Sequence, residues 1–124
     1  MPSPIPILQQ GRFLIASVQS VLDDDDWVRL RGELAHRVVS GRAEGVIVDV
    51  TSADVLDSFA TRMLRSIAEI SRLRGARTVI AGIAPDVAFA MVQLGLTLDG
   101  ISTVLDLDSA LAVLNRRTAG GDAG

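Results

Sequence analysis

The chain of 124 residues contains no cysteine, and its twelve basic residues are all arginine. The absence of cysteine excludes disulfides, zinc-ribbon sites and thiol nucleophiles. The absence of lysine excludes a phosphate-loop lysine and a Schiff-base lysine. Several enzyme classes are therefore ruled out before any motif is considered.

Histidine and aromatic residues are almost as scarce. His36 is the single histidine, and helical spacing puts it about 180° from Trp27, on the side away from the expected core. A hydrolytic triad needs a histidine beside its nucleophile, so we predict that His36 is simply solvated. Three phenylalanines and one tryptophan give little support to an aromatic-lined ligand pocket.

Charge and hydropathy exclude further classes. The net charge is −3 and the arginines are interleaved with acidic residues, so no basic footprint for nucleic acid is present. Although 48% of the residues are hydrophobic, no run approaches the ~20 apolar residues of a membrane helix, and the start lacks a signal-peptide pattern. We expect a cytoplasmic protein without nucleic-acid or membrane partners. A single domain is predicted over residues 1–117, followed by a disordered tail over residues 118–124.

Short apolar runs alternate with amphipathic segments, which is typical of an α/β fold. Residues 5–9 and 12–18 predict a hairpin around Gly11, and the prolines at positions 4 and 6 favour a sheet edge for its first strand. Residues 46–50, 78–83 and 103–105 predict three further strands. Since a helical segment precedes each of these, we predict a mostly parallel sheet with an N-terminal edge hairpin and four helices.

The helices are predicted from their caps and apolar stripes. The run of four aspartates from Asp23 begins the first helix, and Gly41 is expected to end it. Further helices are predicted over residues 58–74 and 85–94, and after a cap at Asp106. The expected core positions are Trp27, Leu30, Leu34 and Val38 in the first helix, and Phe59, Ala60, Met63, Leu64, Ile67, Ala68 and Ile70 in the second.

The loop over residues 51–58 lies where a parallel sheet carries its binding edge, at the carboxyl ends of the strands. Asp49, Asp54 and Asp57 in or beside it offer oxygen ligands of the kind that Mg²⁺ prefers. No phosphate-binding glycines or basic clamp accompany them. We therefore predict neither a metal nor a cofactor.

The pair Asp57–Ser58 at the start of the second helix has two interpretations. Both residue types are favoured helix caps, and a cap needs no further function. Alternatively, Ser58 is exposed at the helix N-terminus and accepts a phosphoryl group, which adds charge and acceptor oxygens that the helix dipole tolerates.

Residues 46–59, Val-Ile-Val-Asp-Val-Thr-Ser-Ala-Asp-Val-Leu-Asp-Ser-Phe, resemble the strand, loop and phosphoacceptor helix of STAS domains, the anti-anti-sigma-factor fold. The order of the elements also matches that family. Residues 5–8, 22–24, 82–85 and 94–96 are similar to the small STAS-only scaffold proteins of bacterial stressosomes. The resemblance extends over residues 5–117.

This resemblance implies a phosphorylatable scaffold without enzymatic activity of its own. Ser58 would be the phosphorylation site, and Asp54, Asp57, Phe59 and Arg62 around it would contact a partner. The implied partners are a STAS paralogue with an N-terminal sensory domain, in a homo- and hetero-oligomer, a switch serine/threonine kinase and a cognate phosphatase. Phosphorylation of Ser58 would release the captured kinase.

Two other functions remain open from the sequence. One is a free-standing anti-sigma-factor antagonist, although those proteins often carry a small residue after the acceptor serine and Phe59 stands here. The other is a small-ligand-binding module that uses the strand-end crevice near Asp49 and Ser58.

Overall fold

The computed structural model describes residues 5–98 and 100–119 and shows an α/β fold. In chain order its elements are β1 (Ile7–Gln10), β2 (Phe13–Ser17), α1 (Asp24–Gly41), β3 (Gly45–Asp49), α2 (Ser58–Leu73), β4 (Arg77–Ala81), α3 (Pro85–Gln93), β5 (Ser102–Val104) and α4 (Leu107–Ala119). The predicted fold class, with an edge hairpin, a mostly parallel sheet and four helices, is confirmed.

The five strands follow one another across the sheet in the order β1-β2-β3-β4-β5. β1 pairs antiparallel with β2, and every later pair is parallel. Gly11, with φ +60°, makes the hairpin turn, and the first strand lies at the sheet edge as predicted. Pro6 precedes β1, while the prediction for Pro4 lies outside the described residues.

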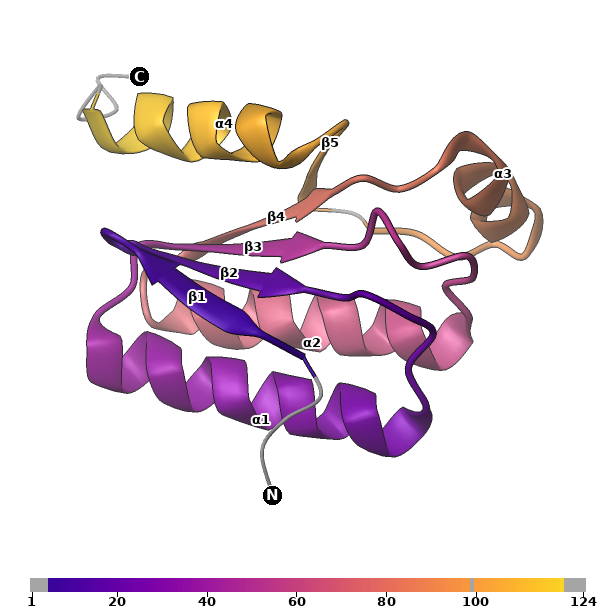
Figure 1. Cartoon of the computed structure of the whole chain (residues 1–124), viewed down its shortest axis with the longest axis horizontal. Coiled ribbons are helices and arrows are strands. Elements are labelled where there is room, and N and C mark those ends of the chain that lie inside the picture. Colours follow the sequence, from indigo (N-terminus) through magenta and orange to yellow (C-terminus); the bar gives the residue numbers. More distant parts are fainter. Residues whose placement is uncertain (1–4, 99, 120–124) are drawn as a thin grey trace.

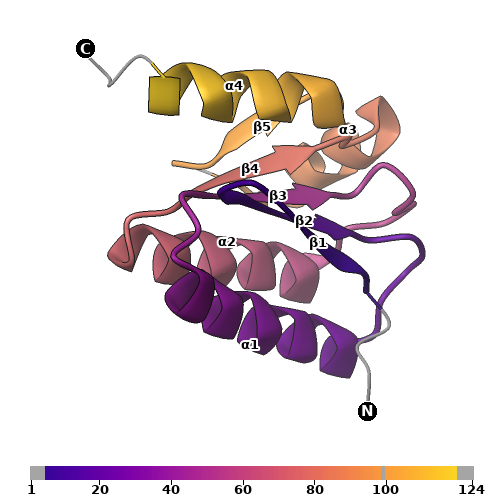
Figure 2. The same ribbon diagram turned by 60° about the vertical axis from the view of Figure 1, so that its left-hand side comes forward.

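The sheet is covered on two sides by different helices. α1 and α2 lie side by side under one face, α4 crosses the other, and α3 stands beyond the ends of the strands (Figures 1 and 2). Val46 and Val48 belong to the larger cluster under α1 and α2, whereas Ile47 between them belongs to the smaller cluster under α4. β3 is therefore the central, doubly covered strand that its apolar run predicts.

The first helix follows its predicted pattern. Asp23 is the N-cap, and its side chain forms a reciprocal capping box with Asp26. The four predicted core residues, Trp27, Leu30, Leu34 and Val38, are all buried. His36 is exposed, as predicted. The predicted stop at Gly41 is displaced by one position, because Arg42 takes the left-handed conformation that ends the helix.

The core face of α2 differs from the prediction at several positions. Phe59, Ala68 and Ile70 are only partly buried, whereas Thr61 and Ser71 are buried. Thr61 can occupy a core position because its hydroxyl donates to the carbonyl oxygen of Asp57 at 2.9 Å. Ala60, Met63, Leu64 and Ile67 are buried as predicted.

The remaining boundaries shift by one or two residues. β4 ends at Ala81 instead of residue 83, because Gly82 has φ +85° and turns the chain away from the sheet. Asp106 caps α4 as predicted, with its Oδ1 accepting from the Ser109 N–H at 2.8 Å. α4 continues to Ala119, beyond the predicted domain boundary at residue 117, and residues 120–124 of the predicted tail lie outside the described residues. Over the described part of the chain, none of the helices combines the length and apolarity that crossing a membrane needs.

Candidate functional site

The candidate site begins where β3 ends, and backbone hydrogen bonds to both neighbouring strands hold this end. The Asp49 carbonyl accepts from the Val18 N–H, and the Val50 N–H donates to the Ala81 carbonyl, each at 2.9 Å. The loop that follows is anchored by the buried side chains of Ala53 and Leu56. Its remaining residues can therefore be exposed at fixed positions.

Thr51 holds this loop to the end of β3 and against the residue that follows β4. Its hydroxyl donates to the Asp49 carboxylate at 2.6 Å, and its backbone N–H donates to the same oxygen at 3.0 Å. Gly82 passes so close that an added Cβ would lie 2.0 Å from the Thr51 Oγ1. Only glycine fits there, so the loops after β3 and β4 are packed against each other.

Asp57 is the N-cap of α2. Its Oδ1 accepts from the Ala60 N–H at 2.8 Å, while its backbone carbonyl accepts from both the N–H and the hydroxyl of Thr61 at 2.9 Å. The capping interpretation of Asp57 is thus confirmed. This aspartate fixes where the helix begins, and with it the position of the next residue.

Ser58 is the first residue of α2, and its side chain is exposed. The free N–H groups and the dipole of a helix N-terminus favour negative charge close by. A rigid cap on one side and an accessible hydroxyl on the other satisfy the steric needs of a modification site.

Phe59 and Arg62 continue this surface. Phe59 is half-buried and packs against the larger core cluster, and the Arg62 guanidinium lies over its ring at 5.6 Å from the centroid. Arg62 itself is exposed. Both residues lie within the first turn and a half of α2, beside Ser58.

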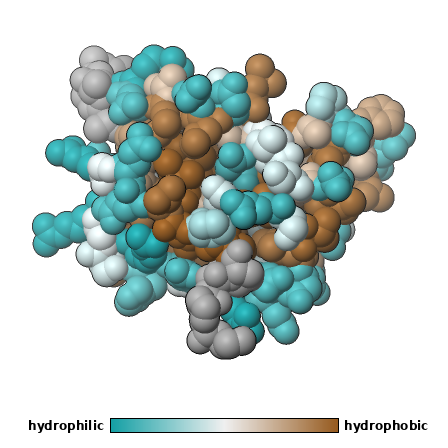
Figure 3. Space-filling view, in the orientation of Figure 1, coloured by the Kyte–Doolittle hydropathy of each residue, from teal (hydrophilic) through white to brown (hydrophobic). Residues whose placement is uncertain are grey.

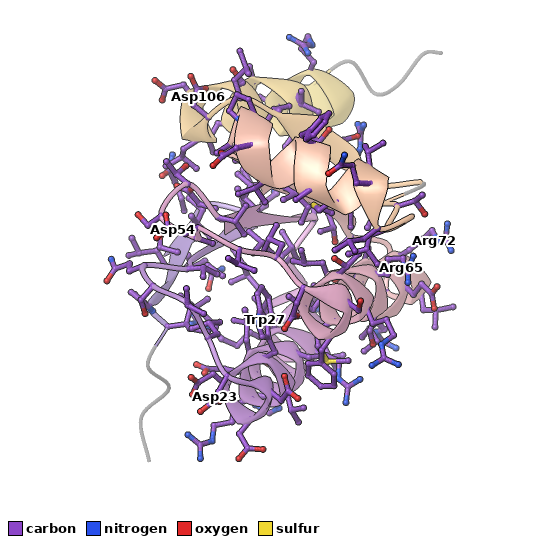
Figure 4. The ribbon with its side chains drawn as sticks, turned by 90° about the vertical axis from the view of Figure 1, so that its right-hand side faces the viewer. Asp23, Trp27, Asp54, Arg65, Arg72 and Asp106 are labelled. Atoms are coloured by element: carbon purple, nitrogen blue, oxygen red, sulfur yellow. The ribbon has the colours of Figure 1, made fainter. Side chains whose placement is uncertain are left out.

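The structure separates the three aspartates considered for a metal. Asp49 is engaged by Thr51, Asp57 caps α2, and Asp54 is exposed on the loop between them. Among the described residues no three histidine, aspartate or glutamate side chains gather in a way that could hold a metal ion. Figure 4 looks onto this end of the molecule, with Asp54 on one side of α3 and Arg65 and Arg72 on the other.

Three contacts at this site were not predicted from the sequence. They are the bond from Thr61 to the cap carbonyl, the close approach of Gly82 to Thr51, and the bond from the Arg65 Nη1 to the Thr97 carbonyl at 3.0 Å. The first has a local signal, because Thr61 stands one helical turn after Asp57. The other two join segments far apart in the chain, and no local pattern marks them.

Comparison with known proteins identifies the fold family. The sequence profile of the STAS domain matches residues 4–110. The chain belongs to the STAS domain family. It is similar to the RsbT co-antagonist protein RsbRC of Bacillus subtilis, with 32% identity over 115 residues that cover 90% of this chain and 39% of that protein. The RsbT co-antagonist protein RsbRA of the same organism is 28% identical over 99 residues, covering 80% of this chain and 35% of that protein. The chain thus spans about two-fifths or less of these relatives.

The solved structures give full-length matches. RsbS S58E of Moorella thermoacetica has a TM-score of 0.83 and 30% identity, and the match covers 94% of this chain and 99% of that one. A chain in a structure that describes the molecular architecture of the stressosome has a TM-score of 0.74 and 28% identity. That match covers 91% of this chain and 98% of the other. The resemblance of this STAS chain to stressosome proteins is thereby confirmed. The anti-sigma factor antagonist SpoIIAA, at 14% identity and TM-score 0.69, shares the fold.

Proposed function

We propose that this STAS protein is a non-enzymatic scaffold of a bacterial stressosome in the cytoplasm, and that it captures a switch serine/threonine kinase until Ser58 is phosphorylated. The observation that carries the proposal is the exposed Ser58 hydroxyl on a rigidly capped helix, in a chain that matches RsbS of Moorella thermoacetica along almost its whole length.

The names and lengths of the relatives support the proposed partners. RsbRA and RsbRC are named co-antagonists of RsbT, and they are more than twice as long as the segment that this chain matches. We infer that paralogues of that kind, with an N-terminal sensory domain, co-assemble with this chain. We further infer that the antagonised partner is the switch kinase and that a cognate phosphatase restores the serine.

The modification itself is a phosphoryl transfer from ATP. The Ser58 Oγ loses its proton and forms a bond to the γ-phosphorus, while the bond from that phosphorus to the bridging oxygen breaks and ADP leaves. The product carries about −1.5 to −2 charge at neutral pH. Because the group stands at a helix N-terminus, the domain stays folded and the change is confined to the docking surface.

We infer that the docking surface consists of Asp54, Asp57, Phe59 and Arg62 around Ser58. Asp57 and Phe59 flank the acceptor in the chain, Arg62 follows about one helical turn later, and Asp54 is exposed on the loop before α2. The surface thus combines an apolar ring with charges of both signs. A dianionic phosphate added among them changes both the charge and the hydration of the surface, so a partner selected for the unmodified form is released.

The test is ATP-dependent phosphorylation by a candidate switch kinase, with the modified residue mapped by mass spectrometry. Wild type should be modified at Ser58, Ser58→Ala should not be modified, and Ser52→Ala is the matched control because Ser52 is an exposed serine in the adjacent loop. Label that persists in Ser58→Ala would place the site elsewhere. No modification of wild type by an active kinase would contradict the switch.

Assembly is tested separately by light scattering after gel filtration. Mixed with an RsbR-type paralogue, the chain should enter a particle far larger than either protein alone, and a free-standing antagonist should remain a monomer or dimer. Thermal stabilisation by a small metabolite in place of assembly would favour a ligand-binding module.

A further inference from the structure

Arg62 stands between two possible partners on the surface of α2. The residue is four positions after Ser58 and three positions after Phe59, and both spacings bring side chains together on a helix. At about 100° per residue, Arg62 points roughly 40° from the direction of Ser58 and 60° from that of Phe59. One guanidinium can therefore reach either neighbour.

In the unmodified protein, Arg62 lies over Phe59. The guanidinium is 5.6 Å from the ring centroid, and Phe59 is half-buried with its other side packed against the core. The arginine thus covers part of the ring that would otherwise face water. Such a contact is weak at an exposed site, so a stronger acceptor within reach can replace it.

The other arginines of α2 are less able to respond. The Arg65 Nη1 already donates to the Thr97 carbonyl at 3.0 Å. Arg72 is exposed near the far end of the helix, fourteen positions after Ser58 and thus about 21 Å along its axis. The carboxylate of Asp57, which directly precedes Ser58, is engaged by the Ala60 N–H. Among the arginines of α2, Arg62 is therefore the one best placed to meet a charge added at Ser58.

We propose that phosphorylation of Ser58 draws Arg62 off the Phe59 ring and into an ion pair with the phosphate. The inference rests on the proposed phosphorylation of Ser58. Guanidinium and phosphate pair through two parallel hydrogen bonds. Since Ser58 and Phe59 lie on opposite sides of Arg62, about 100° apart around the helix, turning the guanidinium toward the phosphate carries it away from the ring. The modification then has two effects on the surface, because it adds a partly neutralised anion and uncovers an aromatic ring.

The test uses protein with phosphoserine incorporated at position 58 during translation, so that no kinase is needed. The second pKa of the phosphate, ordinarily about 6, is measured by ³¹P NMR titration at low salt. Pairing with Arg62 lowers this pKa, so Arg62→Ala should raise it by roughly 0.2–0.7. Arg72→Ala is the matched control, since it removes the same charge from the same helix at a distance, and it should leave the value nearly unchanged.

A second measurement follows the ring directly. Nuclear Overhauser contacts between the Arg62 side chain and the Phe59 ring should be present in the unmodified protein and lost in the phosphorylated one. Contacts that persist after phosphorylation would overturn the proposal, as would equal pKa values in Arg62→Ala and wild type, or equal shifts in both arginine variants. Since the phosphoserine is encoded, these outcomes are independent of whether a kinase modifies Ser58.

Discussion

Asp57 holds three donors at the start of α2 through its carboxylate and its carbonyl. Ser58 owes its position to this cap, because the first helical residue is placed by the residue before it. The aspartate thus supports the candidate phosphorylation site without being its chemical centre.

Asp57→Ala should lower the free energy of unfolding by about 0.5–2 kcal/mol, since it leaves the Ala60 N–H without its acceptor. Asp54→Ala is the control, because Asp54 is an exposed aspartate three positions earlier, and a change within about 0.5 kcal/mol is expected. Urea unfolding monitored by Trp27 fluorescence measures both. Equal stabilities of the two variants would show that the cap contributes nothing.

Gly82 and Gly75 share a left-handed backbone, with φ of +85° and +82°, but differ in their surroundings. Alanine at Gly75 meets open space, so only the backbone strain of about 1–2 kcal/mol is expected. Alanine at Gly82 adds a collision with the Thr51 Oγ1, and we expect a further loss of about 1–3 kcal/mol.

The same unfolding experiment compares Gly82→Ala with Gly75→Ala. Since the backbone cost is common to both, their difference isolates the contact between the two strand-end loops. Equal losses in the free energy of unfolding would show that the loop after β3 moves to make room for the added methyl group. That outcome would contradict the rigid packing of the two loops described above.

Among the helices, α3 is the least closely packed against the other elements. Val87 and Met91 are its buried residues, while Phe89 and Val92 are 64% and 75% exposed. Figure 3 shows the resulting apolar surface over this helix at the right of the view. Few buried contacts make local opening easy.

Amide hydrogen exchange should therefore be faster in α3 than in α2 and β3. The three segments provide their own control, because one exchange experiment on the whole protein reports all of them. Protection of α3 equal to that of α2 would contradict the expectation and indicate that its exposed face is covered in solution. A slower α3 in the presence of an RsbR-type paralogue would place this helix in the assembly.

Local signals predicted the elements well but not their long-range contacts. Short stretches of sequence carry the signals for the Asp23 cap, the apolar stripe from Trp27 to Val38 and the Asp57 cap. The structure has each of these features at the predicted position. The predicted end of β4 was wrong by two residues. The left-handed turn at Gly82, which ends the strand, packs against Thr51, and this residue is thirty-one positions away in the chain.

The two faces of the whole molecule are covered unequally. α1 and α2 pack under the sheet, whereas α4 packs over β3, β4 and β5 and leaves the hairpin side more open. Leu8 pairs with Ile15 and so points to the α4 side, where it is 65% exposed. Figure 3 shows an apolar area between α4 and the hairpin, in keeping with the proposed assembly with other subunits.

The strand order, in which each strand lies beside the one before it in the chain, has a consequence for biosynthesis. Every new strand leaving the ribosome finds its pairing edge already made, so the sheet can grow at the pace of translation without waiting for a distant segment. Strand pairing does not cover the faces of the sheet, however. The apolar face around Ile47 and Val79 stays uncovered until α4 has emerged. We therefore expect chaperones to bind nascent chains from which α4 has not yet emerged.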